Sequence, residues 1–148
     1  MAAVAVLTSS VGPQCDRSND DRPRHCPPSV RSLLNQARRG LLDAEYAVHP
    51  VDRYAQAHVA ALRAAAAVLA ARARPRKSAQ PANAWVLLAT VAPELAEWAR
   101  FFAATSATRA AAEAGVHRLV TDRDADDLVR QAGAFVTLAG HAAAGTSR

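Results

Sequence analysis

The sequence lacks isoleucine altogether, and only seven of its 148 residues are aromatic. Because β-branched and aromatic side chains favour strands, this shortage argues against all-β and doubly wound α/β folds. The six glycines form no G-x-G-x-x-G or Walker pattern, so we expect neither kind of phosphate-binding loop. The longest nearly apolar run, residues 64–71, is far shorter than the roughly 20 residues that a membrane-spanning helix requires.

Cysteine is also scarce, since the chain has only Cys15 and Cys26. His25 precedes the second of them, but there is no C-x2-C pair, so we predict neither a metal site nor a cofactor. The first ten residues lack the basic stretch and the long apolar core of a secretory signal. We therefore expect a cytoplasmic protein with reduced thiols that does not bind a membrane.

Alanine and arginine dominate what is present. The chain has 38 alanines, and 17 of its 18 basic residues are arginine, which gives a formal net charge of +5. Alanine is the strongest helix former, so the composition predicts an all-α fold. The positive charge permits binding to nucleic acid without establishing it.

The chain divides into one domain and two flanking segments. Residues 1–28 hold four of the eight prolines and show no helical periodicity, so we predict that they are disordered. The ordered helical domain is expected over residues 29–140, and residues 141–148 are expected to fray.

Apolar residues at helical spacing predict a first helix from Ser29 to a break at Pro50, and a second over residues 51–72. A third helix begins after the N-cap Asn83. Pro93 lies inside this third pattern and must either kink the helix or split it.

A shorter helix is expected from Ser106 to Gly115, and the last helix begins at a capping box of Thr121 and Asp124. Four main helices and one short one, joined by short connections, predict an antiparallel bundle of four to five helices. The alanine stripes on these helices fit either a tight core or the face of a homodimer, and both interpretations stay open.

Two local groups of like charge stand out. Four cations fall within six residues of the loop after the second helix: Arg72, Arg74, Arg76 and Lys77. They form either a mobile site for the phosphates of RNA or a solvated connector. Four aspartates open the last helix, and we interpret them as partners of its dipole rather than as metal ligands: Asp122, Asp124, Asp126 and Asp127.

Arg53 and His58 lie five residues apart on the second predicted helix. A neutral histidine can take the proton of a ribose 2′-hydroxyl or give one to a leaving 5′-oxygen. An arginine can hold the scissile phosphate and stabilise its growing charge, so such a pair can cleave RNA without a metal. His58 also shares an apolar stripe with Tyr54 and Leu62, which favours a histidine packed in the core.

Three segments resemble a small stand-alone HEPN family of actinobacteria. The run from Arg53 through His58 to Arg72 resembles the signature helix of HEPN domains. Residues 84–99, which include the stretch Pro-Glu-Leu-Ala-Glu-Trp, and residues 124–130 are similar to other parts of the family. The resemblance implies a helical bundle in a superfamily associated with RNA cleavage and with RNA or nucleotide binding. It also implies that Arg53 holds the phosphate and that His58 is the acid or base.

We therefore predict a HEPN-like domain that engages RNA or nucleotides, with metal-independent RNA cleavage by Arg53 and His58 as the catalytic hypothesis. The alternative is a non-catalytic, dimeric helical module that acts as a partner or regulator. Geometry distinguishes the two, because catalysis requires His58 in an accessible cleft within reach of the Arg53 guanidinium, in one chain or across a dimer.

Overall fold

The structure is a computed structural model that describes residues 28–72 and 83–145, and all of its regular elements are helical. The described residues contain no strand, which confirms the predicted all-α fold. None of the described helices is both long and apolar enough to cross a bilayer. The predicted disordered segment lies outside the described residues, apart from its last residue. The elements in chain order are α1 (Pro28–Tyr46), α2 (Pro50–Arg72), α3 (Ala84–Val91), η1 (Pro93–Leu95), α4 (Ala96–Glu113), η2 (His117–Leu119) and α5 (Asp122–Ala144).

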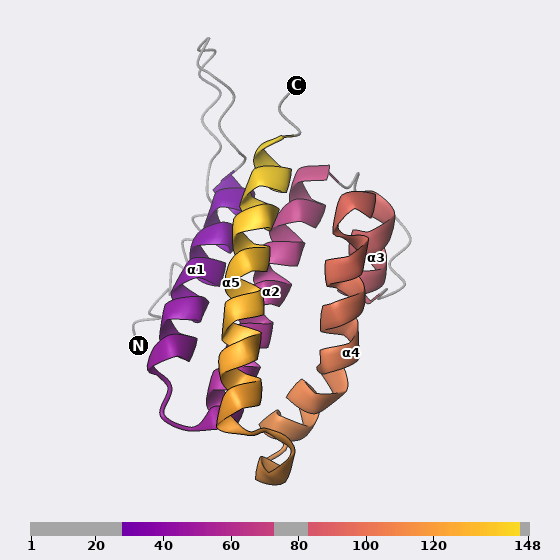
Figure 1. The fold of residues 1–148 in the computed structure, drawn as a ribbon. Coiled ribbons are helices and arrows are strands. Elements are labelled where there is room, and N and C mark those ends of the chain that lie inside the picture. Colours follow the sequence, from indigo (N-terminus) through magenta and orange to yellow (C-terminus); the bar gives the residue numbers. More distant parts are fainter. Residues whose placement is uncertain (1–27, 73–82, 146–148) are drawn as a thin grey trace, which may run out of the picture.

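The long helices form an up-and-down bundle (Figure 1). α1 and α4 run in one direction, and α2 and α5 run in the other, which is the antiparallel arrangement predicted from the sequence. α2 packs against all four of the other helices and so occupies the centre of the bundle. The start of α1 and the ends of α2 and α5 lie at the same end of the molecule (Figure 1).

Alanine determines how closely α2 approaches its neighbours. Six of its ten buried residues are alanines, whose methyl groups keep the neighbouring backbones close. Gly40 of α1 lies against one of them, because a Cβ added at Gly40 would stand 3.3 Å from the Cβ of Ala60. The glycine in α1 therefore serves a close helix–helix contact.

Aromatic side chains fill the other half of the core, between α3, α4 and α5. Phe102 of α4 is fully buried, and its ring centroid lies 5.1 Å from that of Trp85 and 5.2 Å from that of Phe135. Trp98 stacks on the same group, with its ring centroid 5.8 Å from that of Phe135. The large rings between α4 and α5 keep these two helices apart, whereas the small side chains of the alanines let α1, α2 and α5 pack closely.

Pro93 splits the third predicted helix into α3 and α4, with η1 between them, as expected. The separate helix predicted from Ser106 was wrong, because α4 runs unbroken through this position. The hydroxyls of Thr105 and Ser106 donate to the carbonyl of Phe102, at 2.9 and 3.0 Å, and so are satisfied within the helix instead of ending it. Gly115 follows the end of α4 with a φ of +88°, the conformation expected of a residue just beyond a helix.

The predicted start of the last helix is confirmed, but its end is not. The hydroxyl of Thr121 accepts from the backbone N–H of Asp124, and the Asp124 carboxylate accepts from the backbone N–H of Thr121. The helix does not fray from Gly140 and continues to Ala144. Burial explains the extension, since Ala143 is only 2% exposed and packs in a small cluster with residues of α1 and α2.

We expect Ala61→Leu to lower the free energy of unfolding by about 1–3 kcal/mol, because extra methylenes in a closely packed core force the helices apart. Ala61 is fully buried in α2. Ala70→Leu makes the same change on an exposed position of α2 and should alter stability little. Urea unfolding compares the two, and equal stabilities would contradict the close packing of α2.

Candidate functional site

His58 is the one buried polar residue among those that the structure describes, with 1% of its surface exposed. Its ring meets Trp85 of α3 and Phe102 of α4 edge-on, with centroids 5.8 Å apart in both cases. Its Nε2 lies 3.0 Å from the carbonyl oxygen of Phe102. His58 therefore lies in the core, on the apolar face of α2, and its hydrogen bond links α2 to α4.

The hydrogen-bond partner of His58 determines which of its ring nitrogens carries the proton. A carbonyl oxygen can only accept a hydrogen bond, so Nε2 carries the proton and donates it to Phe102. Nδ1 is buried and has no hydrogen-bond partner in the structure. Burial lowers the pKa of His58 below its ordinary value of 6.5; the hydrogen bond to Phe102 opposes this shift and nearby Arg109 adds to it. His58 is therefore a neutral imidazole at neutral pH.

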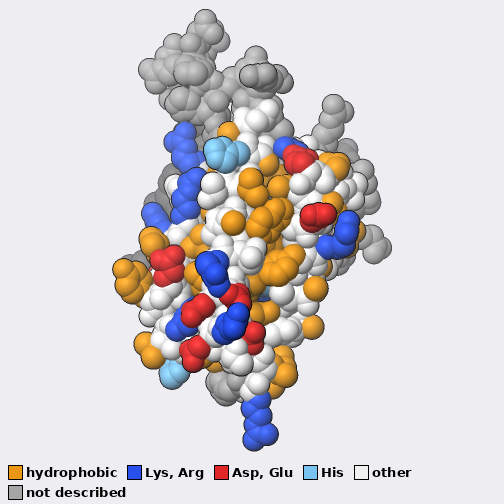
Figure 2. Space-filling model, in the orientation of Figure 1, with side chains coloured by type: hydrophobic (Ala, Val, Ile, Leu, Met, Phe, Trp, Pro, Cys, Tyr) orange, Lys and Arg blue, Asp and Glu red, His pale blue; other side chains and the backbone are white. Residues whose placement is uncertain are grey.

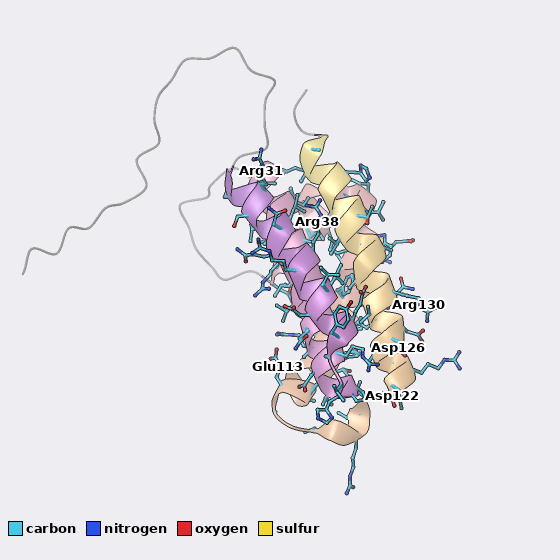
Figure 3. The ribbon with its side chains drawn as sticks, turned by 90° about the vertical axis from the view of Figure 1, so that its left-hand side faces the viewer. Arg31, Arg38, Glu113, Asp122, Asp126 and Arg130 are labelled. Carbon is cyan, nitrogen blue, oxygen red and sulfur yellow. The ribbon has the colours of Figure 1, made fainter. Side chains whose placement is uncertain are left out.

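Arg53 lies in the first turn of α2 and points toward a different part of the bundle. Its Nε and Nη2 donate to the carbonyl of Ala47, at 3.3 and 3.2 Å. Its Nη1 donates to the carboxylate of Asp126 at 2.6 Å and lies 3.9 Å from that of Asp122. Both aspartates stand on the first turns of α5 (Figure 3). Arg53 therefore joins the turn between α1 and α2 to the beginning of α5.

The structure does not bring Arg53 and His58 together within one chain. Five residues along a helix correspond to about 140° of rotation and about 7.5 Å of rise. Each side chain consequently meets different neighbours, Arg53 at α5 and His58 at α3 and α4. Arg53 borders a surface cleft of about 460 Å³ together with Asp126, whereas His58 lines none of the three clefts that we describe.

A larger cleft, of about 640 Å³, lies between α4 and α5 and is reached by Tyr54 of α2. Tyr54 is only 6% exposed, and burial raises the pKa of its phenol, while hydrogen bonds with Thr108 and Thr105 of α4 act in the opposite direction. The exposed side chains of Phe101 and Leu119 border the same cleft. Asp124, Asp127 and Arg130 of α5 also line it, so the cleft offers hydroxyls, apolar edges and more negative than positive charge, and no set of cations for phosphate.

Sequence reasoning missed this cleft because Tyr54 follows the apolar stripe of α2 and reads as an ordinary core residue. The signal that could have revealed it is the pair Thr105 and Thr108. They are three residues apart on an alanine-rich helix, and that spacing places both hydroxyls on one face.

Only one of the four cations predicted to bind phosphate lies within the described residues. Arg72 ends α2, forms an ion pair with Glu94 of η1, and donates from Nη2 to the carbonyl of Ala142 at 3.3 Å. It therefore ties the end of α2 to η1 and to α5. The other members of the predicted group fall outside the described residues: Arg74, Arg76 and Lys77.

The arginines of α1 and α2 differ in their partners. Those nearest α5 and η1 are paired with carboxylates, as described for Arg53 and Arg72. Four others have no carboxylate partner among the described residues, and one of them, Arg38, donates to the neutral Asn35. We call the remaining three the basic face: Arg31, Arg39 and Arg63.

Two features keep the basic face positive. α1 carries no carboxylate before Asp43, so none lies near Arg31 on that helix, and Asp43, one turn after Arg39, forms no ion pair with it. Arg63 reaches from α2 onto α1, with its Nη1 3.6 Å from the position of a Cβ at Gly40. Blue side chains accordingly follow the α1 edge of the molecule, while red and blue mix over the first turns of α5 (Figure 2).

The aspartates at the start of α5 do more than balance its dipole. Asp124 completes the capping box, and the backbone N–H of Thr121 lowers the pKa of its carboxyl group. Asp122 and Asp126 face Arg53, a partnership that the sequence analysis did not foresee. Within residues 28–72 and 83–145, no three histidine, cysteine, aspartate or glutamate side chains are arranged to hold a metal ion.

We expect the free energy of unfolding to fall as the pH drops below about 6.5, the ordinary pKa of histidine. Because the pKa of His58 is lowered in the folded chain, the unfolded chain takes up the proton more readily. The stabilisation is complete above the unfolded pKa and is lost as the pH falls toward the folded value. His58→Gln cannot titrate and should show a flatter profile between about pH 7 and 5 in urea unfolding. Identical pH profiles would contradict a buried neutral His58.

Arg53→Ala should destabilise the fold by about 1–3 kcal/mol, because it leaves the Ala47 carbonyl and the Asp126 carboxylate without their donor. Arg123→Ala is the matched control. Its side chain is 91% exposed and lies 4.0 Å from Asp127, so we expect a change within about 0.5 kcal/mol. Thermal unfolding of both variants measures these changes. An equal loss of stability in the two variants would contradict a stabilising role for the contacts of Arg53.

A comparison with known protein families identifies the family of the chain. Residues 44–139 match the model of the SAV_6107-like HEPN family. This match includes all of α2, α3 and α4 and most of α5, and it covers more than half of the chain. No curated protein and no solved structure matches the chain. The HEPN resemblance seen in the sequence is therefore confirmed, and the chain belongs to the SAV_6107-like HEPN family.

Proposed function

We propose that this chain is a non-catalytic HEPN domain that binds RNA on the basic face formed by Arg31, Arg39 and Arg63. The burial of His58, at 1% exposure, is the observation that supports the absence of catalysis. A general acid or base must come within about 3 Å of the proton that it moves. A ribose cannot approach a ring enclosed by Trp85 and Phe102, and the proton on Nε2 is already donated to a carbonyl.

The surroundings of Arg53 support the same conclusion. Its Nε, Nη1 and Nη2 each have a partner in the folded chain. A scissile phosphate would have to displace Asp126 and would then meet the negative charges of Asp122 and Asp126 at short range. These carboxylates repel the group that a catalytic arginine must hold.

RNA binding is supported by the arginines that are left without an acidic partner. A guanidinium that is not neutralised by a carboxylate can bind phosphate and release the counterions of the nucleic acid. The basic face offers such groups on two adjacent helices, with Arg63 lying against α1 beside Gly40. Because Arg31 and Arg39 are eight residues apart on α1, their positions differ by about 12 Å along the helix axis. This spread suits several phosphates of an extended strand.

The loop between α2 and α3 extends the proposal. Arg74, Arg76 and Lys77 follow the end of α2, and this end lies at the same end of the bundle as the start of α1 (Figure 1). We retain these three as phosphate contacts of the proposed RNA site. Arg72 contributes structurally instead, through its contacts with Glu94 and Ala142.

Salt-dependent binding tests the basic face. For a single-stranded RNA, we expect Arg39→Ala/Arg63→Ala to weaken binding and to reduce the slope of log K against log salt by about 1.4, or about 0.7 for each lost contact. Arg123→Ala/Arg130→Ala removes the same charge from α5, where both arginines lie beside Asp127, and should leave the slope unchanged. Fluorescence anisotropy over a range of salt concentrations measures both variants.

The same RNA tests catalysis. We expect the wild-type chain to leave it intact during long incubation with EDTA. An unchanged salt slope in Arg39→Ala/Arg63→Ala would reject the basic face. RNA cleavage that His58→Ala abolishes would instead favour the nuclease predicted from Arg53 and His58.

A further inference from the structure

Tyr46, the last residue of α1, is the most exposed large hydrophobic side chain among the described residues, with 84% of its surface open to solvent. Its ring meets no other aromatic ring in the part of the chain that the structure describes. Leu42, one turn earlier, is 55% exposed, and Val48, just after the helix, is 81% exposed. A ring so placed contributes little to the core, so its apolar faces are free to receive a ligand.

The helical register brings Tyr46 into line with the basic face. Seven residues, or about two turns, separate it from Arg39, so the two lie on one face of α1 about 10.5 Å apart along its axis. Arg63 reaches onto α1 beside this line. Arg38 and Glu45 belong to another side of α1, where they border a cleft of about 610 Å³ with α5. The arginines of the basic face thus lead along α1 to an exposed aromatic ring.

The charges beside Tyr46 differ from those of the basic face. Asp43 lies three residues before it and Glu45 directly before it, and neither has an ion pair among the described residues. Their carboxylates repel phosphate from this end of α1. Carboxylate oxygens can, however, accept hydrogen bonds from the amino groups of bases. The surroundings of Tyr46 therefore suit a base rather than the sugar–phosphate backbone.

We propose that Tyr46 stacks on an unpaired base of the RNA whose phosphates bind Arg39 and Arg63, so that the basic face selects single-stranded RNA. This inference rests on the proposed function and adds the substrate class. Every base has a π-face, so stacking on a tyrosine strengthens binding without requiring one sequence. In a duplex the bases are already paired and stacked, and they cannot cover the ring. A duplex therefore keeps the phosphate contacts and gains nothing from Tyr46.

Fluorescence anisotropy with single-stranded oligocytidylate and with a blunt RNA duplex tests the stacking. We expect Tyr46→Ala to weaken the binding of oligocytidylate about 5- to 150-fold, which corresponds to the roughly 1–3 kcal/mol of one stacked base. The slope of log K against log salt should not change, because the substitution removes no positive charge. The affinity for the duplex should also stay the same. 2-Aminopurine placed in the oligocytidylate reports the contact directly, and the wild type should quench its fluorescence whereas Tyr46→Ala should not.

Two control variants separate stacking from other effects. Tyr46→Phe keeps the ring and should bind oligocytidylate like the wild type. Phe101→Ala removes an exposed aromatic ring from α4 and should leave the affinity unchanged. Tyr46→Ala should fold normally, because substitutions at so exposed a position alter stability little. Circular dichroism of each variant checks the fold.

The outcomes distinguish this inference from RNA binding itself. If Tyr46→Ala binds oligocytidylate as tightly as the wild type, or still quenches 2-aminopurine, stacking on Tyr46 is wrong. Should Arg39→Ala/Arg63→Ala lower the salt slope at the same time, RNA binding on the basic face stands and only the role of Tyr46 fails. Equal weakening of single strand and duplex by Tyr46→Ala would contradict the selection of single strands. A wild type that binds neither RNA would overturn both proposals.

Discussion

Alanine methyl groups along α2 let α1 and α5 lie close to it, and the spacing of the other helices follows from this contact. The contact surface of α2 with α1 and α5 buries little apolar area per residue, because each alanine contributes one methyl group. The aromatic side chains around Phe102 bury the apolar area that these alanines do not provide, since a buried aromatic ring removes about 150–250 Å² from water. The core is consequently uneven, narrow between α1, α2 and α5 and wide between α3, α4 and α5.

His58 stands where these two halves meet. An alanine at this position of α2 could not span the wider gap to α4, whereas an imidazole fills it and donates to the Phe102 carbonyl. The same carbonyl also accepts the hydroxyls of Thr105 and Ser106, so this point of α4 gathers several donors. A ring held in this way by α3 and α4 serves packing, and its neutral state follows from the same burial.

The sequence was sufficient for the helices because their signals are local. Alanine content, the proline at position 93 and the capping box of Thr121 each act within a few residues, and the structure agrees with all three. The predicted break at Ser106 failed because a serine can satisfy its hydroxyl inside a helix as well as at its start. The fraying expected over residues 141–148 was wrong for residues 141–144, because Ala143 is buried against α1, a contact between distant segments that the local sequence does not reveal.

The site was harder to predict because it depends on partners far away in the sequence. Arg53 and Asp126 are 73 residues apart, and nothing near either of them reveals the ion pair. The sequence shows that an arginine and a histidine lie five residues apart on one helix. It does not show which side chains from the rest of the fold contact each of them. The aspartates of α5 were predicted to open the helix, and Asp122 and Asp124 do lie in its first turn, yet the pairing of Asp122 and Asp126 with Arg53 depends on where the turn between α1 and α2 lies.

The distribution of charge, too, follows only partly from the composition and otherwise depends on the structure. The net charge of +5 permits RNA binding, but it is the pairing of individual arginines that locates the positive surface. Neighbouring residues on a helix point about 100° apart, so Arg38 borders a cleft of about 610 Å³ between α1 and α5, whereas Arg39 lies outside it. Two adjacent arginines of α1 thus belong to different surfaces, Arg38 to this cleft and Arg39 to the basic face. Which surface each arginine joins depends on where α5 packs against α1, and the local sequence of α1 does not determine that packing.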